Sequence, residues 1–285
     1  MKDVTNAMRA HILTAAVPYI KQYTDLYVVV KYGGNAMIDE ELKKSVMKDL
    51  MLLQLVGVKV VLVHGGGPAI NSTLDAMKIE SHFANGLRVT DEATMDVVQM
   101  VLAGKVNKGL VADLTDLGGK AVGLCGVDGN MIQVHKQNDE LGYVGSIDTI
   151  DTSIIDDVIS RGYIPVISSI GMGADGKTYN INADTVAAKI AGALEAETMV
   201  AMTNIDGVLR DVHDPSSLIS KITMAEADQL KAEGIIAGGM IPKVDCCLEA
   251  IKSGAQKVFI INGEIPHAIL IELLTNEGLG TMFVK

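Results

Sequence analysis

The chain has 285 residues, of which 48% are apolar and 21% are charged, and its formal net charge is −11. A chain of this length and apolar content buries a substantial core without disulfides, which excludes a disordered protein. The acidic balance excludes a broad nucleic-acid-binding surface, so an anionic ligand would need a local positive pocket.

The cysteines and the amino terminus indicate the compartment. Cys125, Cys246 and Cys247 are too few for a disulfide framework and form no C-x-x-C pair, so we interpret them as small residues of a reduced core and predict no metal site. The first residues carry acids and polar groups where a signal peptide needs an apolar run, and no stretch is long enough to span a membrane. We therefore expect a cytoplasmic protein with neither membrane nor nucleic acid as a partner.

The first 22 residues stand apart from the rest of the chain. Apolar side chains recur there at helical spacing, among them Met8 and Ile12, and Pro18 is expected to kink or end this helix. A helix that precedes the first strand has no place inside a parallel sheet. We therefore expect it to pack on the outside of the domain or to dock on another subunit.

Strand-like runs then alternate with helical patterns. The apolar runs are continuous and β-branched, which is typical of strands buried on both faces of a parallel sheet. We predict strands over residues 26–31, 58–63, 120–124, 163–169, 198–202 and 257–262. We predict helices over residues 39–56, 68–78, 91–116, 151–161, 184–196, 223–233, 240–253 and 266–274. This alternation predicts an α/β fold, an open αβα sandwich with a mainly parallel central sheet.

Two regions break the alternation. Residues 130–149 have the pattern of hairpin strands, and residues 171–182 have that of a turn-rich connection. We place the boundary between two lobes near residue 175 and expect the lobes to share one continuous sheet. The domains would then be an N-terminal helix over 1–24, a first lobe over 25–175 and a second lobe over 176–285.

Two glycine-rich segments follow buried strands, and each suits an anion. Lys31 ends the first strand in VVVKYGGNAM, with Gly33 and Gly34 behind it. In VVLVHGGGPAIN three glycines lead from a strand into a helix, whose bare N–H groups form an anion cradle. Because ligands collect at the carboxyl ends of strands in open α/β sheets, both segments are candidates for binding phosphate. The alternative interpretation without a bound ligand is that Lys31 is solvated and the glycines only form turns.

The sequence motifs of other sites that use such glycines are missing or only weakly indicated. The chain has no G-x-x-x-x-G-K-[ST] sequence, which excludes a Walker-type nucleotide site. An esterase oxyanion hole would need a G-x-S-x-G elbow, which is also missing. The single G-x-G-x-x-G, at 171–176, is not followed directly by a helix, so it is a weak indication of dinucleotide binding.

Two cations lie near expected helix starts. Arg88 precedes a helix capped by Thr90 or Asp91, where a guanidinium can grip a carboxylate bidentately. Lys243 lies in the first turn of a helix behind a glycine pair. Either could also be a solvated surface residue.

The segment YNINAD carries amide and carboxylate side chains. Asn180, Asn182 and Asp184 share one face if this segment is extended. Asp184 could instead cap the helix that follows. Beside a phosphate site, a carboxylate is useful only if it orients lysines or a metal.

The combined inventory favours phosphoryl transfer. It contains lysines, glycine cradles, an arginine and a carboxylate, but no nucleophile–base pair, and phosphoryl transfer relies on positioning and charge neutralisation. It especially suits transfer to a carboxylate, which is ionised at neutral pH and needs no general base.

These segments resemble those of the acetylglutamate kinases, a branch of the amino acid kinase family. The resemblance covers essentially the whole chain and rests on the following motifs, in this order: KYGGNAM, VHGGGPAIN, GLRVTD, NINADTVAAKIAGAL, TNIDGVL and GGMIPKV. It implies an enzyme that phosphorylates the side-chain carboxylate of N-acetyl-L-glutamate with ATP, in the second step of arginine synthesis. It also implies that residues 25–175 bind acetylglutamate and residues 176–285 bind ATP.

The resemblance assigns roles to single residues. Lys31 and Lys243 would stabilise the transferring phosphoryl group, and Asp184 would hold both lysines. The remaining assignments are Gly34 and Gly66 for phosphate, Gly66, Gly67, Arg88 and Asn180 for acetylglutamate, and Thr203, Asn204, Gly207, Gly239 and Met240 for the nucleotide. Mg²⁺ would bridge the ATP phosphates.

The ends of the chain resemble the arginine-inhibited branch, in which a kinked N-terminal helix interlaces dimers into a hexameric ring. That similarity implies a homohexamer, a trimer of dimers, with an arginine site that includes Tyr19, Glu272 and Gly278. One position departs from the branch, because Phe259 stands where its members often have histidine.

Two other functions stay open. One is a kinase for a near substrate, above all acetylaminoadipate, which differs from acetylglutamate by one methylene. The other is a non-catalytic, arginine-binding regulatory subunit. Intact Lys31, Asp184 and Lys243 argue against the latter.

Overall fold

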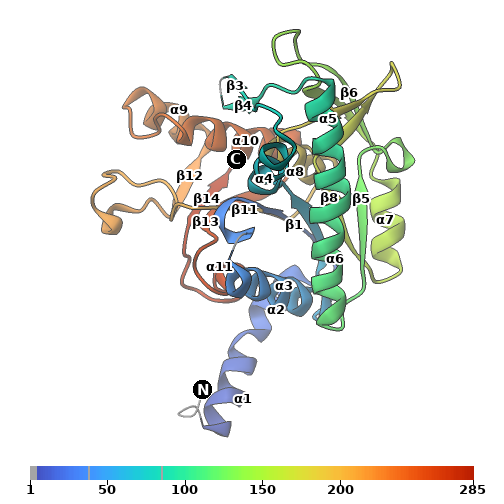
Figure 1. Cartoon of the computed structure of the whole chain (residues 1–285). Coiled ribbons are helices and arrows are strands. Elements are labelled where there is room, and N and C mark those ends of the chain that lie inside the picture. Colours follow the sequence, from blue (N-terminus) through green and yellow to red (C-terminus); the bar gives the residue numbers. More distant parts are fainter. Residues whose placement is uncertain (1–4, 38, 85) are drawn as a thin grey trace.

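The structure is a computed structural model that describes residues 5–37, 39–84 and 86–285. Its centre is an eight-stranded sheet with the strand order β12-β14-β13-β11-β1-β2-β8-β5 (Figure 1). The strands are β1 (Tyr27–Tyr32), β2 (Lys59–His64), β5 (Ala121–Cys125), β8 (Ile164–Ser168), β11 (Thr198–Thr203), β12 (Lys221–Thr223), β13 (Lys257–Asn262) and β14 (Thr281–Val284). All neighbouring pairs are parallel except β13 and β14. The predicted α/β fold and mainly parallel sheet are therefore confirmed.

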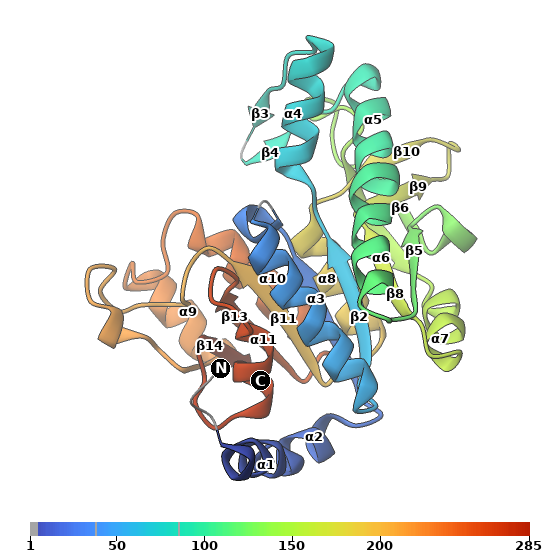
Figure 2. The same cartoon turned by 60° about the horizontal axis from the view of Figure 1, so that its bottom comes forward.

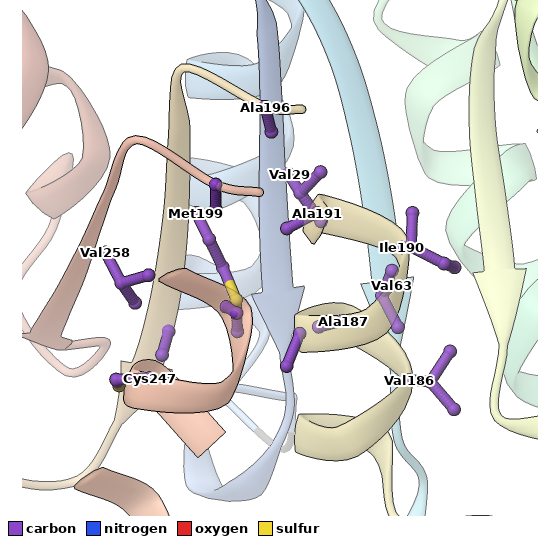
Figure 3. Close-up of a cluster of buried hydrophobic side chains, with 14 of the residues drawn as sticks. Val29, Val63, Val186, Ala187, Ile190, Ala191, Ala196, Met199, Cys247 and Val258 are labelled. Atoms are coloured by element: carbon purple, nitrogen blue, oxygen red, sulfur yellow. The ribbon is translucent and has the colours of Figure 1, made fainter. Parts of the chain in front are cut away.

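Helices cover both faces of this sheet and enclose two apolar cores. The first core lies between the strands and α7 (Ser153–Ser160), α8 (Ala183–Ala193), α9 (Met224–Ala232) and α10 (Met240–Ser253). Figure 3 shows part of it, with Val29 and Met199 of the strands beside Ala187 and Ala191 of α8. The second core lies between the other face and α3 (Glu40–Leu55), α6 (Asn107–Asp116) and α11 (Ala268–Leu274) (Figure 2).

A second sheet has four strands, in the order β10-β9-β6-β7, and includes a segment that was predicted to be a loop. The predicted hairpin over 130–149 is present as the antiparallel strands β6 (Ile132–Lys136) and β7 (Gly145–Ile150). The prediction of a loop over 171–182 was wrong, because β9 (Ile170–Gly173) and β10 (Thr178–Asn180) pair there and join β6. Alternating small and apolar residues over so short a span gave no strand signal. Residue 175 lies in the turn of this hairpin.

The long helix predicted over 91–116 is not α-helical in its middle part. The structure has α5 (Glu92–Gln99), a π-helical segment η2 (Met100–Val106) and then α6, which follow one another without a break. The side chain of Asp91, not that of Thr90, caps α5 by accepting a hydrogen bond from the Thr94 N–H. Propensity does not separate a π turn from an α turn, so the sequence could not reveal η2.

The N-terminal segment forms two helices, α1 (Asn6–Ala15) and α2 (Val17–Tyr23), with Pro18 in the first turn of α2. α1 buries none of its residues and projects from the body of the molecule (Figure 1), whereas Tyr23 of α2 is buried. The break expected at Pro18 is therefore confirmed. Residues 1–4 lie outside the described part of the chain.

The remaining elements are short or border the site. They are α4 (Gly67–Met77), the hairpin β3 (Phe83–Ala84) and β4 (Leu87–Arg88), and the 3-10 turns η1 (Gly34–Met37), η3 (Asp128–Asn130) and η4 (Pro215–Ser217). None of the helices in the described ranges is both long and apolar enough to cross a lipid bilayer.

Candidate active site

A cavity of about 310 Å³ opens at the carboxyl ends of β1, β2 and β8. Its lining includes the predicted residues Lys31, Gly34, Gly66, Gly67, Arg88, Asn180 and Asp184. The parallel sheet explains this convergence, because loops that leave the same edge lie side by side even when they are far apart in sequence. The structure thus brings together every residue predicted to bind acetylglutamate or its phosphate.

Lys31 and Asp184 form an ion pair inside this cavity. The Nζ of Lys31 lies 3.0 Å from Oδ1 of Asp184, and the two side chains are 12% and 26% exposed. Asp184 is not the helix cap, because the side chain of Asn182 caps α8 by accepting from the N–H groups of Asp184 and Thr185. The Asp184 carboxylate is therefore free to hold the lysine at the end of β1.

The triple-glycine loop forms another part of the cavity lining. Gly67 begins α4, so the first N–H groups of that helix face the cavity and favour an anion. A Cβ on Gly66 would lie 2.6 Å from Cδ2 of Leu102, which belongs to η2. A larger residue at position 66 would therefore have to displace the end of the Leu102 side chain, and the loop packs directly against η2.

Arg88 supplies a fixed positive charge. Its side chain is held by hydrogen bonds to the hydroxyl of Ser81 and, at 2.6 Å, to Oδ1 of Asn71, and its guanidinium lies 4.7 Å from the centre of the Phe83 ring. The residue is only 7% exposed, and burial lowers its pKa. Within the described ranges it forms no ion pair with a carboxylate, so its charge is available to a ligand.

Asn180 reaches the same cavity from β10. Its Nδ2 donates to the hydroxyl of Thr90 over 3.3 Å, and that hydroxyl donates to the carbonyl of Arg88. This chain of contacts links the hairpin β9–β10 to the strand that carries Arg88.

A second cavity of about 390 Å³ lies beyond β11. Three predicted nucleotide residues line it, Asn204, Gly207 and Met240. Gly207 has a φ of +148° and a Cβ there would lie 2.5 Å from Oγ1 of Thr281, so only glycine fits. Of the other two predicted nucleotide residues, Thr203 ends β11 and Gly239 precedes α10, and in the described chain neither lines this cavity.

Lys243 lies on the helix that faces Asp184. It is half-buried in the first turns of α10, and within the described residues it forms no ion pair. Three positions further on, the Cys246 thiol hydrogen-bonds to Thr185 of α8 and senses the charge of Asp184; burial and that charge raise the pKa of Cys246 to about 11. Positions three apart share one helix face, so Lys243 lies on the side of α10 that faces α8.

The predicted effector residues lie on the opposite side of the sheet from α8. Oε2 of Glu272 accepts hydrogen bonds from the N–H groups of Leu279 and Gly280, at 2.7 and 3.1 Å. A Cβ on Gly278 would lie 3.3 Å from Oε1 of the same carboxylate, and burial raises the pKa of Glu272. Tyr19 is partly buried on α2 against the second core.

Sequence reasoning missed four residues that shape the site. Asn71, Ser81 and Phe83 hold Arg88. Asn71 ends the VHGGGPAIN segment, but no local pattern connects it, Ser81 or Phe83 with Arg88. His64 lies directly before the triple glycine, and this adjacency was the one signal that could have identified it.

No group of three metal-ligating side chains occurs in the parts of the chain that the structure describes. The carboxylate in the first cavity is already paired with Lys31. These residues suit the oxygens of a phosphate chain rather than a protein-held ion. The three cysteines are free thiols.

Comparison with known proteins decides the family. The amino acid kinase family profile matches residues 27–262. The chain belongs to this family. It is 51% identical to the acetylglutamate kinase of Brachyspira hyodysenteriae over 100% of both chains, and 54% identical to that of Clostridium kluyveri over 96% of this chain and 97% of the other.

Solved structures agree with this assignment. A crystal structure of N-acetylglutamate synthase from Neisseria gonorrhoeae with coenzyme A and N-acetyl-glutamate is 27% identical, with a TM-score of 0.84 over 97% of this chain and 63% of that one. The predicted amino acid kinase fold and the resemblance to acetylglutamate kinases are therefore confirmed, and the chain is a kinase.

Proposed function

We propose that this enzyme transfers the γ-phosphoryl group of ATP to the side-chain carboxylate of N-acetyl-L-glutamate, giving N-acetyl-L-glutamyl 5-phosphate in the second step of arginine synthesis. The reaction is supported by sequence identities of 51% and 54%, over nearly the full length, to enzymes named acetylglutamate kinase. The observation that carries the substrate is the buried Arg88, which has no carboxylate partner among the described residues and lies in one cavity with the Lys31–Asp184 pair.

Arg88 would bind the α-carboxylate of the substrate. A buried guanidinium without a counter-ion is costly, and a planar carboxylate satisfies it with two parallel hydrogen bonds. Asn180 would hydrogen-bond to the substrate from β10, and the N–H groups at Gly66 and Gly67 would hold its side chain beside the phosphate. This arrangement points the substrate's second carboxylate at Lys31.

The transfer step needs charge neutralisation rather than a base. An oxygen of the side-chain carboxylate forms a bond to the γ-phosphorus, while the bond to the oxygen bridging the β and γ phosphates breaks, and ADP leaves with that electron pair. No proton moves. Lys31 and Lys243 would neutralise charge on the transferring group, with the N–H groups of Gly34 and Gly66 binding its oxygens and Asp184 holding the lysines.

ATP would enter as its magnesium complex, with the nucleotide in the second cavity. Residues 204–209 and Met240 at the start of α10 line it, which supports binding by Asn204, Gly207 and Met240. Thr203 and Gly239, which are next to these residues in the chain, would bind the nucleotide at the border of the cavity. Mg²⁺ on the phosphates supplies further charge neutralisation. On this reading residues 25–175 form the acetylglutamate lobe and residues 176–285 the ATP lobe.

We also propose arginine feedback and a homohexamer. The apolar side chains of α1 are exposed, which supports docking of this helix on another copy of the chain. Residues 1–24 would then be the assembly segment and would join dimers into a trimer of dimers. Tyr19, Glu272 and Gly278 would form the arginine site. Phe259 is buried in the second core, so its departure from histidine changes the interior beneath this site. We place the reaction in the cytoplasm, where thiols stay reduced.

The test is ADP release with Mg-ATP and N-acetyl-L-glutamate, with glutamate, aspartate and acetylaminoadipate in parallel, each with and without millimolar arginine. We expect turnover with acetylglutamate alone and suppression by arginine. A preference for acetylaminoadipate would replace the substrate assignment. A folded protein that turns over no acceptor would support the regulatory subunit instead.

A further inference from the structure

A buried polar cluster lies directly beneath the triple-glycine loop. His64 is the last residue of β2 and is fully buried, and Asn107, the first residue of α6, is 1% exposed. The Nδ1 of His64 lies 2.9 Å from the carbonyl oxygen of Gly65, and its Nε2 lies 3.0 Å from Nδ2 of Asn107. Neither residue lines the cavity, so neither has a role in the proposed reaction so far.

The partners of this cluster fix the proton of His64. Lys108 can only donate, and its Nζ lies 3.1 Å from Oδ1 of Asn107 and 3.0 Å from the carbonyl oxygen of Gly123. The amide nitrogen of Asn107 must therefore face Nε2 of His64. Its two hydrogens serve this ring nitrogen and the carbonyl of Val166 at 2.8 Å, with the carbonyl of Leu124 as a longer contact at 3.3 Å. Consequently Nε2 of His64 accepts, and its Nδ1 carries the proton and donates to Gly65.

The imidazole is also held neutral. Burial, with a smaller effect of the Lys108 charge, lowers the pKa of His64 to about 4. A second proton would set the Nε2–H of His64 against the amide N–H of Asn107, with no acceptor between them. The Nδ1–H tautomer is thus the form in which neither ring nitrogen of His64 faces another donor with its own proton.

The peptide between His64 and Gly65 is held by β1, because the Gly65 N–H donates to the carbonyl of Tyr32. The peptide between Gly65 and Gly66 is held by the Nδ1–H tautomer of His64, which donates to the Gly65 carbonyl. The next peptide is held by the start of α4, because the carbonyl of Gly66 accepts from the Ile70 N–H. With these peptides fixed, the N–H groups of Gly66 and Gly67 have one orientation toward the cavity.

The π-helical segment η2 positions the other residues that contact the glycine loop and His64. Leu102 and Val106 of η2 lie 2.6 and 3.3 Å from the position of a Cβ on Gly66, and Asn107 follows η2 directly. An extra residue in one turn rotates everything behind it by about 100°, so η2 sets which side chain faces His64. π turns of this kind occur frequently at functional sites.

We propose that His64 and Asn107 are positioning residues for the triple-glycine loop. They orient the N–H groups of Gly66 and Gly67 toward the acetylglutamate side chain and the transferring phosphoryl group, without touching either. The inference rests on the proposed acetylglutamate kinase activity and adds the hydrogen-bond chain from Asn107 through His64 to Gly65 that prepares the loop.

Two matched variants separate this role from mere stability. In His64→Asn the side-chain amide replaces Nδ1, so the bond to Gly65 is kept and the bond to Asn107 is lost. In His64→Gln the longer side chain reaches the position of Nε2, so the bond to Asn107 is kept and the bond to Gly65 is lost. Each variant removes one buried hydrogen bond, and we expect similar losses in melting temperature.

Steady-state kinetics with each substrate varied is the readout. For His64→Gln we expect the KM for acetylglutamate to rise about tenfold, as for loss of one oriented hydrogen bond, with the KM for ATP nearly unchanged. For His64→Asn we expect the KM for acetylglutamate to stay within about threefold of the parent value. Equal kinetic losses in the two variants, or none in His64→Gln, would overturn the proposal.

A spectroscopic measurement on the unaltered enzyme gives an independent check. Long-range ¹H–¹⁵N correlation of the imidazole ring should show the Nδ1–H tautomer of His64 throughout pH 6 to 8. An Nε2–H tautomer or an imidazolium would overturn the proposal. Failure of the proposed function is distinguishable, because the unaltered enzyme would then not phosphorylate acetylglutamate at all.

Discussion

Lys31 and Asp184 join the end of β1 to the start of α8, with Nζ and Oδ1 3.0 Å apart. A lysine that must neutralise a transferring phosphoryl group needs a fixed position, because its flexible stem otherwise loses much of the electrostatic benefit. The carboxylate of Asp184 supplies such a fixed position for Lys31.

Asp184→Asn should therefore lower kcat strongly and leave folding almost unchanged. We expect a decrease of about 10²-fold in kcat, because the lysine loses its orientation, and little change in melting temperature, because the pair is partly solvated. The control is Glu249→Gln, which breaks the Lys189–Glu249 ion pair that joins the same helix, α8, to α10. Comparable kcat losses in both variants would contradict this role.

Arg88→Lys tests recognition of the α-carboxylate. A lysine keeps the charge but cannot make the bidentate contact or keep the hydrogen bonds to Asn71 and Ser81. We expect the KM for acetylglutamate to rise at least about tenfold, with the KM for ATP unchanged. Arg161→Lys, on the exposed end of α7, is the matched control. A rise in the KM for ATP instead would move Arg88 to the nucleotide.

Much of this site could be predicted from the sequence because its parts follow strands. Lys31 and the triple glycine each lie behind a continuous β-branched run, and a parallel sheet places such strand ends at one edge. Continuous apolar runs were likewise sufficient for six strands of the central sheet. The edge strand β12 and its neighbour β14 are short and carry no comparable run, so they were not predicted.

The parts that could not be predicted depend on contacts between distant segments. Nothing in the sequence around Asn107 indicates that its amide meets His64, since that contact needs the packing of η2 against the glycine loop. The position of Arg88 depends in the same way on Asn71. Local pattern locates the backbone of such a site, whereas tertiary packing determines its hydrogen bonds.

The stability of the protein should depend on pH through His64. Its folded-state pKa of about 4 lies below the ordinary value of 6.5, so the stability it contributes is present above pH 6.5 and is lost as pH falls toward 4. Relative to His64→Asn, the free energy of unfolding of the parent should fall by up to about 3 kcal/mol over this range. Denaturant titrations of both proteins at several pH values measure this difference.

Asp49 should make the stability of the protein depend on pH in the opposite direction. Burial raises its pKa to about 6, against the opposing effect of His267, whose Nδ1 lies 2.6 Å away. Its contribution is therefore present below pH 3.8 and is lost as pH rises through 6. Relative to Asp49→Asn, the parent should become less stable as pH rises over this window. Parallel pH trends for the His64 and Asp49 variants would refute both assignments.

Removal of α1 should change assembly and not folding. None of its residues is buried, and Met8, Ile12 and Leu13 are 54%, 58% and 71% exposed. A helix of this length is marginal without tertiary packing, so we expect it to be stabilised by another copy. Deleting residues 1–15, which spares α2, should reduce a hexamer to dimers in light scattering and preserve turnover. An unchanged particle mass would show that α1 does not mediate assembly.

Glu272→Gln tests the effector site. The half-buried carboxylate uses Oε2 to hold the Leu279 and Gly280 N–H groups, and its Oε1 faces Gly278. Glutamine keeps the shape and one acceptor but removes the charge that a guanidinium needs, so the arginine concentration for half-inhibition should rise about tenfold. Basal kcat should not change, since Glu272 lies outside both cavities.

The control for this variant is Glu277→Gln, which removes an exposed charge five residues further along the chain. Inhibition curves with arginine are measured for the parent and both variants at fixed acetylglutamate. Equal weakening in both variants would mean that arginine senses only the general charge of this surface. If arginine leaves the parent itself uninhibited, the buried Phe259 accounts for the loss most directly, and Phe259→His becomes the variant in which inhibition should be restored.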